Sequence, residues 1–396
     1  MFRFENKLNT QMKVLFVVSD STAHGGTEIL TFNLMRELQG IGVECHLISR
    51  NLYEGDNQFV LNMRCAELLR YRKLLNSPLN KITGSLYSDT YLKDVIRKVA
   101  KELQVDWIVN HTYDMCAAIP TDGSWQTVQV FHWCVEGYEN NLKSVIQKKS
   151  FVPRTLSFVS LRATIKRWHK AISQFDRLVC LTTAAFSEIK RISQLATQGH
   201  ICHIPDPLMQ TQESTEVSSL NNKTIVYVGR LSHEKGVMRL LRIWKCISSQ
   251  IDDCTLKIYG DGNMKDEMER YIHSQQLSRV ELMGFSSDLK EIYTHADLCL
   301  MTSDTEGFGM VLIEAMYYGV PCISFDCPIS PKEIIADAGV IISCFDEDAY
   351  ANAVIELLND KDRLKELQRK SIERAKDFYI NKVTALWLQM LNLRIK

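Results

Sequence analysis

Two successive α/β domains, each built on a doubly wound parallel sheet, are predicted from the order of apolar segments along the chain. Short valine-rich runs alternate with longer segments whose apolar residues recur at helical spacing. The alternation stops at residues 206–223, where Ser, Thr, Asn and Gln are frequent, and it then restarts. A chain of 396 residues is long enough for two independent hydrophobic cores.

The first domain is predicted over residues 1–205. The apolar run KVLFVVSD is typical of a buried parallel strand, and a helical pattern closed by Gly40 and Gly42 follows it. A second strand completes a βαβ unit, and further strands come after it. The predicted strands are 13–20, 43–49, 105–111, 127–133 and 177–182.

The second domain is predicted over residues 206–375, beginning with a linker or mobile loop. Helical patterns again separate short apolar runs, which indicates a second parallel sheet. The remaining residues, 376–396, are predicted to form a C-terminal helix that packs back on the first domain. The predicted strands are 224–230, 254–260, 280–284, 298–303 and 321–325.

Composition narrows the class of protein. Twelve cysteines occur without any Cys-x-x-Cys pair, which argues against a disulfide framework or a zinc module and favours a reducing compartment. We expect no signal peptide, because Glu5 and Asn6 precede only a short apolar run. We also find no apolar window near the roughly 18 residues that a spanning helix needs. These features predict a cytoplasmic protein.

The net charge is zero, but it is distributed unevenly. Residues 1–205 contain 25 basic and 18 acidic residues, whereas residues 206–396 contain 22 basic and 29 acidic residues. A basic half and an acidic half indicate two domains with different partners.

Polar residues of unusual type follow the predicted strands, at the edge where open α/β sheets bind ligands. The loop VGRLSHEKG (228–236) contains Arg230 and Lys235 between glycines. Two cations on such a loop suit a diphosphate, because Arg can contact two oxygens and Lys adds a point charge. A solvated basic loop explains the same residues equally well.

The segment EGFGMVLIE (306–314) contains Glu306 and Glu314 on either side of a glycine turn and a helix start near Met310. A helix start suits phosphate, and carboxylates accept hydrogen bonds from sugar hydroxyls. In the alternative interpretation Glu306 is a helix cap and Glu314 is solvated. However, the helix is apolar nearly all round, so a buried glutamate there would need a partner.

His132 ends a predicted strand and could donate to a sugar hydroxyl, although a core histidine fits the local sequence as well. His111 and Asp114 follow the preceding strand in a similar way. Gly26 lies in a glycine turn before the first helix, a weak indication of an anion site. The acidic run 346–348 precedes an apolar helical pattern, so it is interpreted as a helix cap, and we expect no metal site.

Taken in order, these motifs resemble the retaining glycosyltransferases of the GT-B fold. The family is the large group 1 family with a Glu-x7-Glu signature, which includes glycogen-synthase-like enzymes and bacterial lipopolysaccharide and capsule enzymes. The segments that carry the resemblance are GGTE (25–28), His132, HIPDPL (203–208), VGRLSHEKG (228–236), YGDGNMKDEME (259–269), Glu306 to Glu314 and PKEII (331–335).

The resemblance implies two Rossmann-like domains that face each other across a cleft. The first domain would bind the acceptor, and the second would bind the nucleotide sugar. Glu306 would contact the hexose, and Glu314 would hold the ribose. His132 would lie near the transferred sugar, so Glu306 and His132 are the predicted catalytic residues.

The resemblance also implies how the donor is held. Arg230 and Lys235 would neutralise the departing diphosphate in place of a metal ion. The nucleotide sugar, with UDP as the commoner carrier, would be a co-substrate, and no cofactor is expected. The sugar and phosphates would be lined by Gly26 and by Gly307, Phe308, Gly309, Met310 and Val311.

Three departures from the family pattern leave the donor sugar open. Asp206 replaces the usual hinge asparagine, Ile329 and Ser330 replace a glycine pair, and the ending DAGVII (337–342) is shortened.

Residues 142–170 contain eight Lys or Arg residues and no Asp or Glu, with apolar residues between them. This pattern is typical of binding to an anionic membrane face or a lipid-phosphate acceptor, although a core helix with a solvated basic face fits equally well. The predicted patch, which would place the enzyme at the inner membrane face, consists of Lys148, Lys149, Lys166 and Arg167.

The leading hypothesis is a retaining transferase that moves a hexose-type sugar onto a glycan or lipid-linked glycan in cell-surface polysaccharide synthesis. A nucleotide-sugar epimerase of the same fold and a catalytically silent sugar-nucleotide-binding partner are the alternatives. A nicotinamide oxidoreductase is disfavoured because the G-x-G-x-x-G fingerprint is absent. Nucleic-acid binding is disfavoured because no recognition motif accompanies the basic segment.

Overall fold

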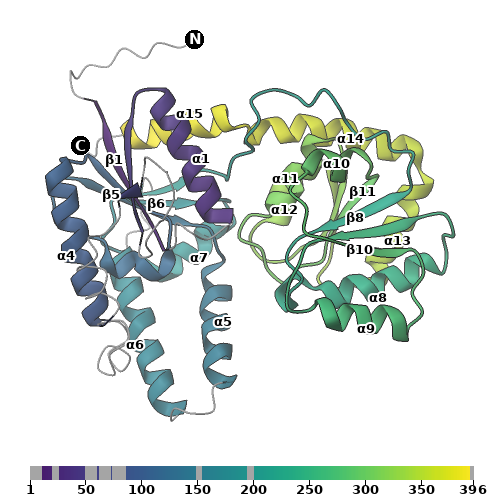
Figure 1. The fold of residues 1–396 in the computed structure, drawn as a ribbon, viewed down its shortest axis with the longest axis horizontal. Helices are drawn as coiled ribbons and strands as arrows, with labels where there is room; N and C mark the ends of the chain where they lie inside the picture. The colour runs from purple at the N-terminus through teal and green to yellow at the C-terminus, as the bar shows by residue number, and fades with distance from the viewer. Residues whose placement is uncertain are drawn as a thin grey trace. The chain divides into compact units, whose positions relative to one another are not determined.

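The computed structural model describes residues 11–19, 26–49, 60–61, 73, 86–148, 154–193 and 200–392. They form two compact units, which Figure 1 shows as ribbons. The first unit contains the described residues up to Ile204 and those from Thr384 onward, and the second unit runs from Pro205 to Val383. Each unit contains its own parallel sheet, which confirms the predicted fold class of two Rossmann-like domains.

Within the described residues, the sheet of the first unit has seven strands in the order β3-β2-β1-β4-β5-β6-β7. The chain moves outward from β1 to β3, returns to β4 beside β1, and then proceeds to the other edge, so the strand order reverses between β1 and β4. Five of the strands were predicted, whereas β3 and β7 are too short to give a pattern. The strands are β1 Lys13–Val18, β2 Glu44–Ser49, β3 Val60–Leu61, β4 Trp107–Asn110, β5 Gln126–Phe131, β6 Arg177–Cys180 and β7 Ile201–His203.

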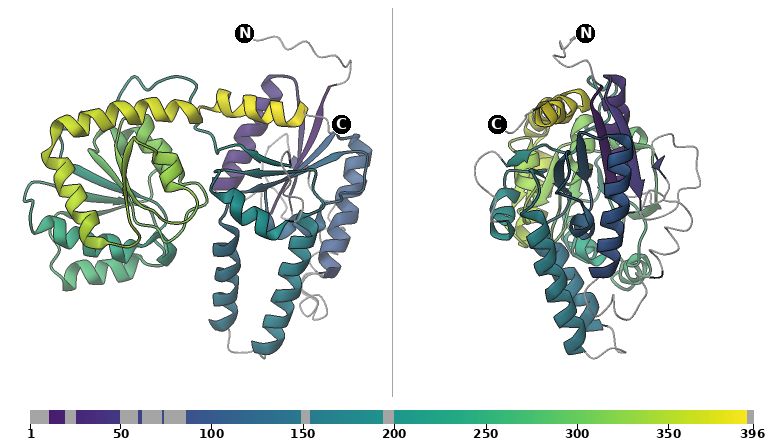
Figure 2. Two further views of the ribbon diagram at one scale, coloured as in Figure 1. Left: turned by 180° about the vertical axis from the view of Figure 1, so that it is seen from behind. Right: turned by 90° about the vertical axis from the view of Figure 1, so that its left-hand side faces the viewer.

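Helices pack against this sheet, and two of them project away from it. Helices α5 and α6 run side by side and extend away from the sheet in both Figure 1 and Figure 2. They carry most of the basic segment identified in the sequence. The helices of the first unit are α1 Gly26–Gly40, α4 Leu86–Leu103, η1 Tyr113–Ala118, α5 Val135–Lys148, α6 Arg154–Ile172 and α7 Ala185–Ile192.

The sheet of the second unit has six strands in the order β10-β9-β8-β11-β12-β13. All strands except β13 were predicted. The residues of β13 are only partly buried, and the chain there is the shortened DAGVII ending, so the apolar signal is weak. The strands are β8 Thr224–Val228, β9 Thr255–Tyr259, β10 Val280–Gly284, β11 Leu298–Met301, β12 Cys322–Phe325 and β13 Gly339–Ile342.

The helices of the second unit enclose a core centred on the fully buried Trp244. The acidic run at 346–348 begins α13, and the side chain of Asp346 accepts a hydrogen bond from the amide of Ala349 at 2.9 Å, which confirms the predicted cap. The helices are η2 His233–Lys235, α8 Val237–Ser248, α9 Lys265–Ser274, α10 Leu289–Thr294, α11 Met310–Tyr317, α12 Pro331–Ile335, α13 Glu347–Asn359, α14 Lys361–Ala375 and η3 Lys376–Phe378.

The last described helix, α15 (Ile380–Asn392), passes from the second unit into the first at Val383 and Thr384. Its Trp387 ring stacks on the ring of His111, with the two centroids 6.0 Å apart. The first unit is therefore completed by a segment from the far end of the chain.

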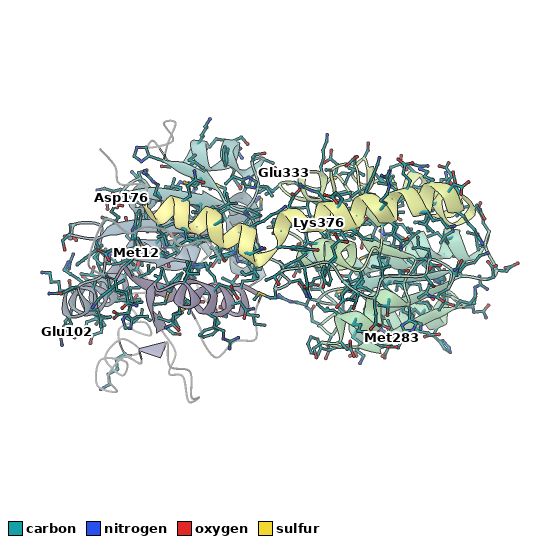
Figure 3. All side chains as sticks on the ribbon, turned by 90° about the horizontal axis from the view of Figure 1, so that it is seen from above. Met12, Glu102, Asp176, Met283, Glu333 and Lys376 are labelled. Atoms are coloured by element: carbon teal, nitrogen blue, oxygen red, sulfur yellow. The ribbon has the colours of Figure 1, made fainter. Side chains whose placement is uncertain are left out.

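Aspartates at the amino ends of strands attach neighbouring strands to one another. Each precedes an apolar strand, and its carboxylate accepts a hydrogen bond from a backbone amide of an adjacent segment. Asp176, labelled in Figure 3, also accepts from the hydroxyl of Thr127 at 2.9 Å. The pairs are Asp106 with Lys13 N (2.8 Å), Asp176 with Thr127 N (2.8 Å) and Asp297 with Asn222 N (3.3 Å). The opposite, carboxyl edge of each sheet is left for binding.

Tyr350→Phe should destabilise the second unit by about 1–3 kcal/mol. The buried Tyr350 hydroxyl donates to the Ile323 carbonyl at 2.6 Å and accepts from the Met301 amide at 3.2 Å, so it connects β12 and β11. Calorimetry of the variant should show a lower Tm. Tyr271→Phe is the control, because the Tyr271 hydroxyl makes no recorded hydrogen bond within the described chain. Equal melting temperatures for the two variants would contradict the bridging role.

Candidate active site

The loop after β8 and the loop after β11 lie directly against each other at the carboxyl edge of the second sheet. The amide of Asp304 donates to the carbonyl of Glu234 at 2.8 Å, and the hydroxyl of Thr302 donates to the Lys235 carbonyl at 3.2 Å. Gly236 has a φ of +65°, and a Cβ on it would lie 2.0 Å from the carbonyl oxygen of Thr302. Only glycine permits this approach, which merges two separate sequence motifs into one surface.

Lys235 and Glu306 form an ion pair on this surface. The Lys235 Nζ atom lies 2.6 and 2.8 Å from the two carboxylate oxygens of Glu306, and the Ser303 hydroxyl donates to the same carboxylate at 2.6 Å. Glu306 is only 8% exposed, so its charge depends on these partners. The sequence predicted that both residues bind ligand, and the structure adds that they bind each other.

Arg230 extends from the same loop into solvent. Its side chain is 66% exposed, and its guanidinium lies 4.0 Å from the carboxylate of Glu234. Exposed pairs at this distance contribute little to stability. Arg230 is therefore available to a second anion.

Arg239 braces the two loops and was missed in the sequence. Its guanidinium donates to the Thr302 carbonyl and to the Asp304 carboxylate, both at 2.8 Å, and it stacks 3.8 Å from the centre of the Phe345 ring. Its position four residues after Lys235, near the start of a predicted helix, is the sequence feature that could have identified it. Without the fold, nothing in the sequence connects it to residues 302–304.

Helix α11 begins at Met310, directly after Gly309, which has a φ of +91°. No side chain caps this end of the helix. Phe308 is buried and its ring packs edge-on against Phe378 at 5.7 Å, which anchors the turn. The start of α11 therefore offers backbone amides and the positive end of the helix dipole, both of which favour an anion.

Glu314 lies one turn further along α11. Burial raises the pKa of its carboxyl from 4.5 to about 7. No hydrogen bond or ion pair joins this carboxylate to any other residue that the structure describes. A desolvated carboxylate without a donor is costly, and a ligand hydroxyl would relieve that cost.

In the first unit, His132 follows β5 as predicted, but its ring is bound to another histidine. His111 Nδ1 and His132 Nε2 are 2.9 Å apart, and the two rings stack with centroids 5.1 Å apart. Burial and the neighbouring His132 hold the pKa of His111 well below 6.5, so His111 is neutral. The Nδ1 atom of His132 is also buried. The ring of His132 would have to turn before either nitrogen could meet a sugar.

The other site residues predicted in the first unit differ in exposure and in their partners. Gly26 is the first residue of α1, and a Cβ on it would meet no atom within 4 Å. Lys166 is exposed. Arg167, in contrast, is bound to the Asp89 carboxylate at 2.6 Å with a mostly buried side chain, so it is less accessible than Lys166. The side chain of Lys148 and the whole of Lys149 lie outside the described residues, as do His24 and Gly25.

Two residues that depart from the family pattern, Ile329 and Ser330, lie between β12 and α12. Ile329 has a φ of +88°, a backbone conformation that a β-branched residue rarely adopts and glycine adopts freely. The chain therefore keeps the backbone of a glycine at this position although the side chain is different. Ser330, the next residue, is buried, and its hydroxyl has no hydrogen-bond partner within the described chain.

No group of three or more His, Cys, Asp or Glu side chains within the described ranges could hold a metal ion. None of the helices in the same ranges has the length and apolar character needed to cross a membrane.

Comparisons of the sequence with known proteins agree with this geometry. Residues 210–378, which include Lys235, Glu306 and Glu314, match the family described as "Glycosyl transferases group 1". An uncharacterized glycosyltransferase of Haemophilus influenzae is 23% identical over 383 residues, which are 96% of this chain and 99% of that protein.

A Campylobacter jejuni enzyme is similar over part of its length. It is named GalNAc-alpha-(1->4)-GalNAc-alpha-(1->3)-diNAcBac-PP-undecaprenol alpha-1,4-N-acetyl-D-galactosaminyltransferase. The two sequences are 29% identical over 206 residues, which cover 51% of this chain and 55% of the enzyme.

Among solved structures, a mutant of S. aureus TarM in complex with Fondaparinux, alpha-GlcNAc-glycerol and UDP has a TM-score of 0.72. It is 13% identical and covers 97% of this chain and 100% of its own. This likeness confirms the GT-B fold, and the family match supports a group 1 glycosyltransferase.

Glu314→Gln should stabilise the protein relative to the wild type as pH rises from 5 to 8. The folded-state pKa of about 7 lies above the ordinary 4.5, so ionisation of Glu314 removes stability as pH rises through that range. The glutamine variant has no such loss, and its relative gain at pH 8 should be at most about 3 kcal/mol. Thermal unfolding at several pH values measures it.

Glu356→Gln on α13 is the matched control, because the side chain of Glu356 is 69% exposed. A difference between Glu314→Gln and wild type that is the same at every pH would show that Glu314 is not desolvated.

Proposed function

We propose that this chain is a retaining glycosyltransferase that transfers a hexose-type sugar from a UDP-sugar to a glycan or lipid-linked glycan. The observation that carries the proposal is the joint surface of the second unit. There the Lys235–Glu306 pair, the uncapped start of α11 and the unpartnered Glu314 occur together. A cation, free amides and two carboxylates are the groups that a nucleotide sugar needs.

Donor binding would replace the ion pair between Lys235 and Glu306 with contacts from each residue to the donor. The diphosphate of the donor contacts Arg230, Lys235 and the amides at the start of α11. As Lys235 turns toward phosphate, the carboxylate of Glu306 is released and accepts hydrogen bonds from hexose hydroxyls. The ion pair thus holds a buried carboxylate ready until the sugar supplies replacement donors.

Glu314 would hold the ribose. A carboxyl with a pKa of about 7 is partly protonated at neutral pH. Hydrogen bonds from two ribose hydroxyls favour the ionised form, so nucleotide binding lowers the pKa of Glu314 and releases a proton. The heat of binding at pH 7 should therefore depend on the ionisation enthalpy of the buffer.

In the transfer step, the bond between the anomeric carbon and the phosphate oxygen breaks, and the acceptor oxygen bonds to that carbon on the same face. The acceptor proton passes to the departing phosphate oxygen. Arg230, Lys235 and the helix start stabilise the charge that develops on UDP, without a metal ion or cofactor. Glu306 orients the hexose, and His132, once its ring has turned away from His111, contacts the transferred sugar.

The names of the compared proteins support the finer parts of this proposal. UDP is present in the TarM complex, which favours UDP as the carrier. The name of the Campylobacter jejuni enzyme contains a PP-undecaprenol-linked glycan, which favours a lipid-linked acceptor in cell-surface polysaccharide synthesis.

A lipid-linked acceptor would place the enzyme at the inner membrane face, with the first unit as the acceptor domain. The cationic patch would then consist of Lys148, Lys149 and Lys166, without the paired Arg167. Reversing these three lysines to glutamate should abolish binding to vesicles that contain anionic phospholipid, measured by co-sedimentation. Reversal of Lys93 and Lys98 on α4 is the control. Unchanged binding of the triple variant would refute the patch.

UDP should raise the Tm of the purified protein, whereas GDP and ADP should raise it less. Binding to the folded state stabilises by mass action, by about 3 kcal/mol at 100 times the Kd. Arg230→Ala and Glu314→Ala should each reduce the UDP-induced shift, and Glu356→Ala should keep it. If none of the nucleotides or their sugar conjugates shifts the Tm, the chain does not bind a donor and the proposal fails.

The reaction itself needs a product measurement. Incubation with a UDP-sugar and a glycan acceptor should release UDP and give an α-linked product from an α-linked donor, detected by mass spectrometry and NMR. Conversion of the UDP-sugar into an epimer without an acceptor would identify an epimerase instead. Binding of the UDP-sugar without any conversion would identify a silent binding partner.

A further inference from the structure

Trp133 is a large aromatic residue whose side chain is exposed to solvent in the folded protein. It lies in the short connection between β5 and α5, directly after His132, and it is 55% exposed. Tryptophan is well buried on average, so exposure of most of an indole at the carboxyl edge of a sheet indicates a contact made outside the fold.

The backbone on both sides of Trp133 is held firmly. His132 is bound to His111 on one side. On the other side the Glu188 carboxylate from α7 accepts from the Glu136 amide at 2.6 Å and contacts the Cys134 sulfur at 3.6 Å. Glu188 is itself buried. The indole is therefore exposed on a rigid connection, and holding it in place for a ligand costs little entropy.

The surroundings of Trp133 are aromatic and hydrogen-bonding. A cavity of about 10 Å³ beside it is lined by aromatic, histidine and aliphatic side chains, among them Tyr113, Tyr138 and Val135. The Tyr113 ring meets the Tyr138 ring edge-on at 5.5 Å, and the Tyr113 hydroxyl donates to Glu139 at 2.8 Å. Glu139 is also 2.8 Å from His169 Nε2, so the carboxylate beneath the aromatic pair already has partners. These side chains present aromatic and apolar surface beside the indole.

We propose that the indole of Trp133 stacks on a pyranose ring of the acceptor glycan and thereby determines acceptor specificity. The inference rests on the proposed function and names one of its acceptor contacts. The electron-rich face of an indole attracts the partly positive C–H groups on the apolar face of a pyranose. The position next to His132 places this contact beside the residue proposed to meet the transferred sugar.

The test uses octyl glycosides of glucose, galactose, N-acetylglucosamine and N-acetylgalactosamine as acceptors, with the UDP-sugar that the enzyme turns over. Trp133→Ala should raise the KM for the preferred octyl glycoside about tenfold, whereas Trp133→Phe should recover part of the loss. The UDP-induced shift in Tm should remain that of the wild type in both variants. Tyr87→Ala on α4, another exposed aromatic of the first unit, should change none of these quantities.

A direct measurement follows the indole itself. Titration with the octyl glycosides should change the fluorescence difference between wild type and Trp133→Phe at sugar concentrations near the KM. An unchanged KM for every acceptor in Trp133→Ala would overturn the inference. So would a loss of the UDP-induced shift together with the acceptor KM, because Trp133 would then support the fold or the donor site.

Two further outcomes would also overturn it. If Trp133→Ala weakens binding of octyl glucosaminide, a charged amino sugar titrated beside the four neutral glycosides, and of none of those four, the indole is a cation–π site. If Trp133→Ala weakens binding to phospholipid vesicles and leaves the acceptor KM unchanged, the indole is a membrane anchor.

The two proposals can fail separately. A wild-type protein that shows no UDP-induced shift and no transfer refutes the proposed function. In that case the fluorescence titration still decides whether Trp133 binds a pyranose. A protein that transfers sugar with the same acceptor KM after Trp133→Ala keeps the proposed function and loses the inference.

Discussion

The contact between the loop after β8 and the loop after β11 is the constraint on which the candidate site depends. It is made by backbone atoms, because Gly236 leaves room for the Thr302 carbonyl where any side chain would collide. Arg239, on the helix that follows the first loop, then holds the second loop through the Thr302 carbonyl and the Asp304 carboxylate. Lys235 and Glu306, 71 residues apart in the chain, become hydrogen-bonded neighbours as a result. Because the strands are parallel, both loops lie at the same edge of the sheet. Their close contact makes them one continuous surface.

Two desolvated carboxylates of the second unit, the buried Glu306 and the partly buried Glu314, differ in their hydrogen-bond partners. Glu306 accepts three short hydrogen bonds from Lys235 and Ser303. Glu314 has no such donors, and burial raises its pKa to about 7. A ligand must compete with Lys235 for Glu306, whereas it meets an unsatisfied group at Glu314. A hydroxyl-rich ligand that also carries phosphate fits both conditions, and this is the physical content of the proposed donor site.

The candidate residues of the first unit lie in a different electrostatic environment. His111 and His132 are bound to each other, and burial keeps His111 neutral, so the pair has no positive charge on His111 that would attract phosphate. Trp133, the next residue, is exposed on a backbone that Glu188 holds in place. The neutral His111 ring and the exposed indole of Trp133 suit an uncharged sugar.

The sequence by itself determined the fold class and most of the strands, because parallel strands that are buried on both faces must be continuous apolar runs. It also placed Arg230, Lys235, Glu306 and Glu314 in segments that follow strands of the second sheet, at the edge where α/β sheets bind ligands. It missed β3, β7 and β13, whose two to four residues carry too little pattern. Only the tertiary structure decided which charges are free. Arg167 is bound to Asp89, Lys235 to Glu306 and His132 to His111. Each of these pairs joins residues between 21 and 78 positions apart, and local sequence patterns contain no information about such partners.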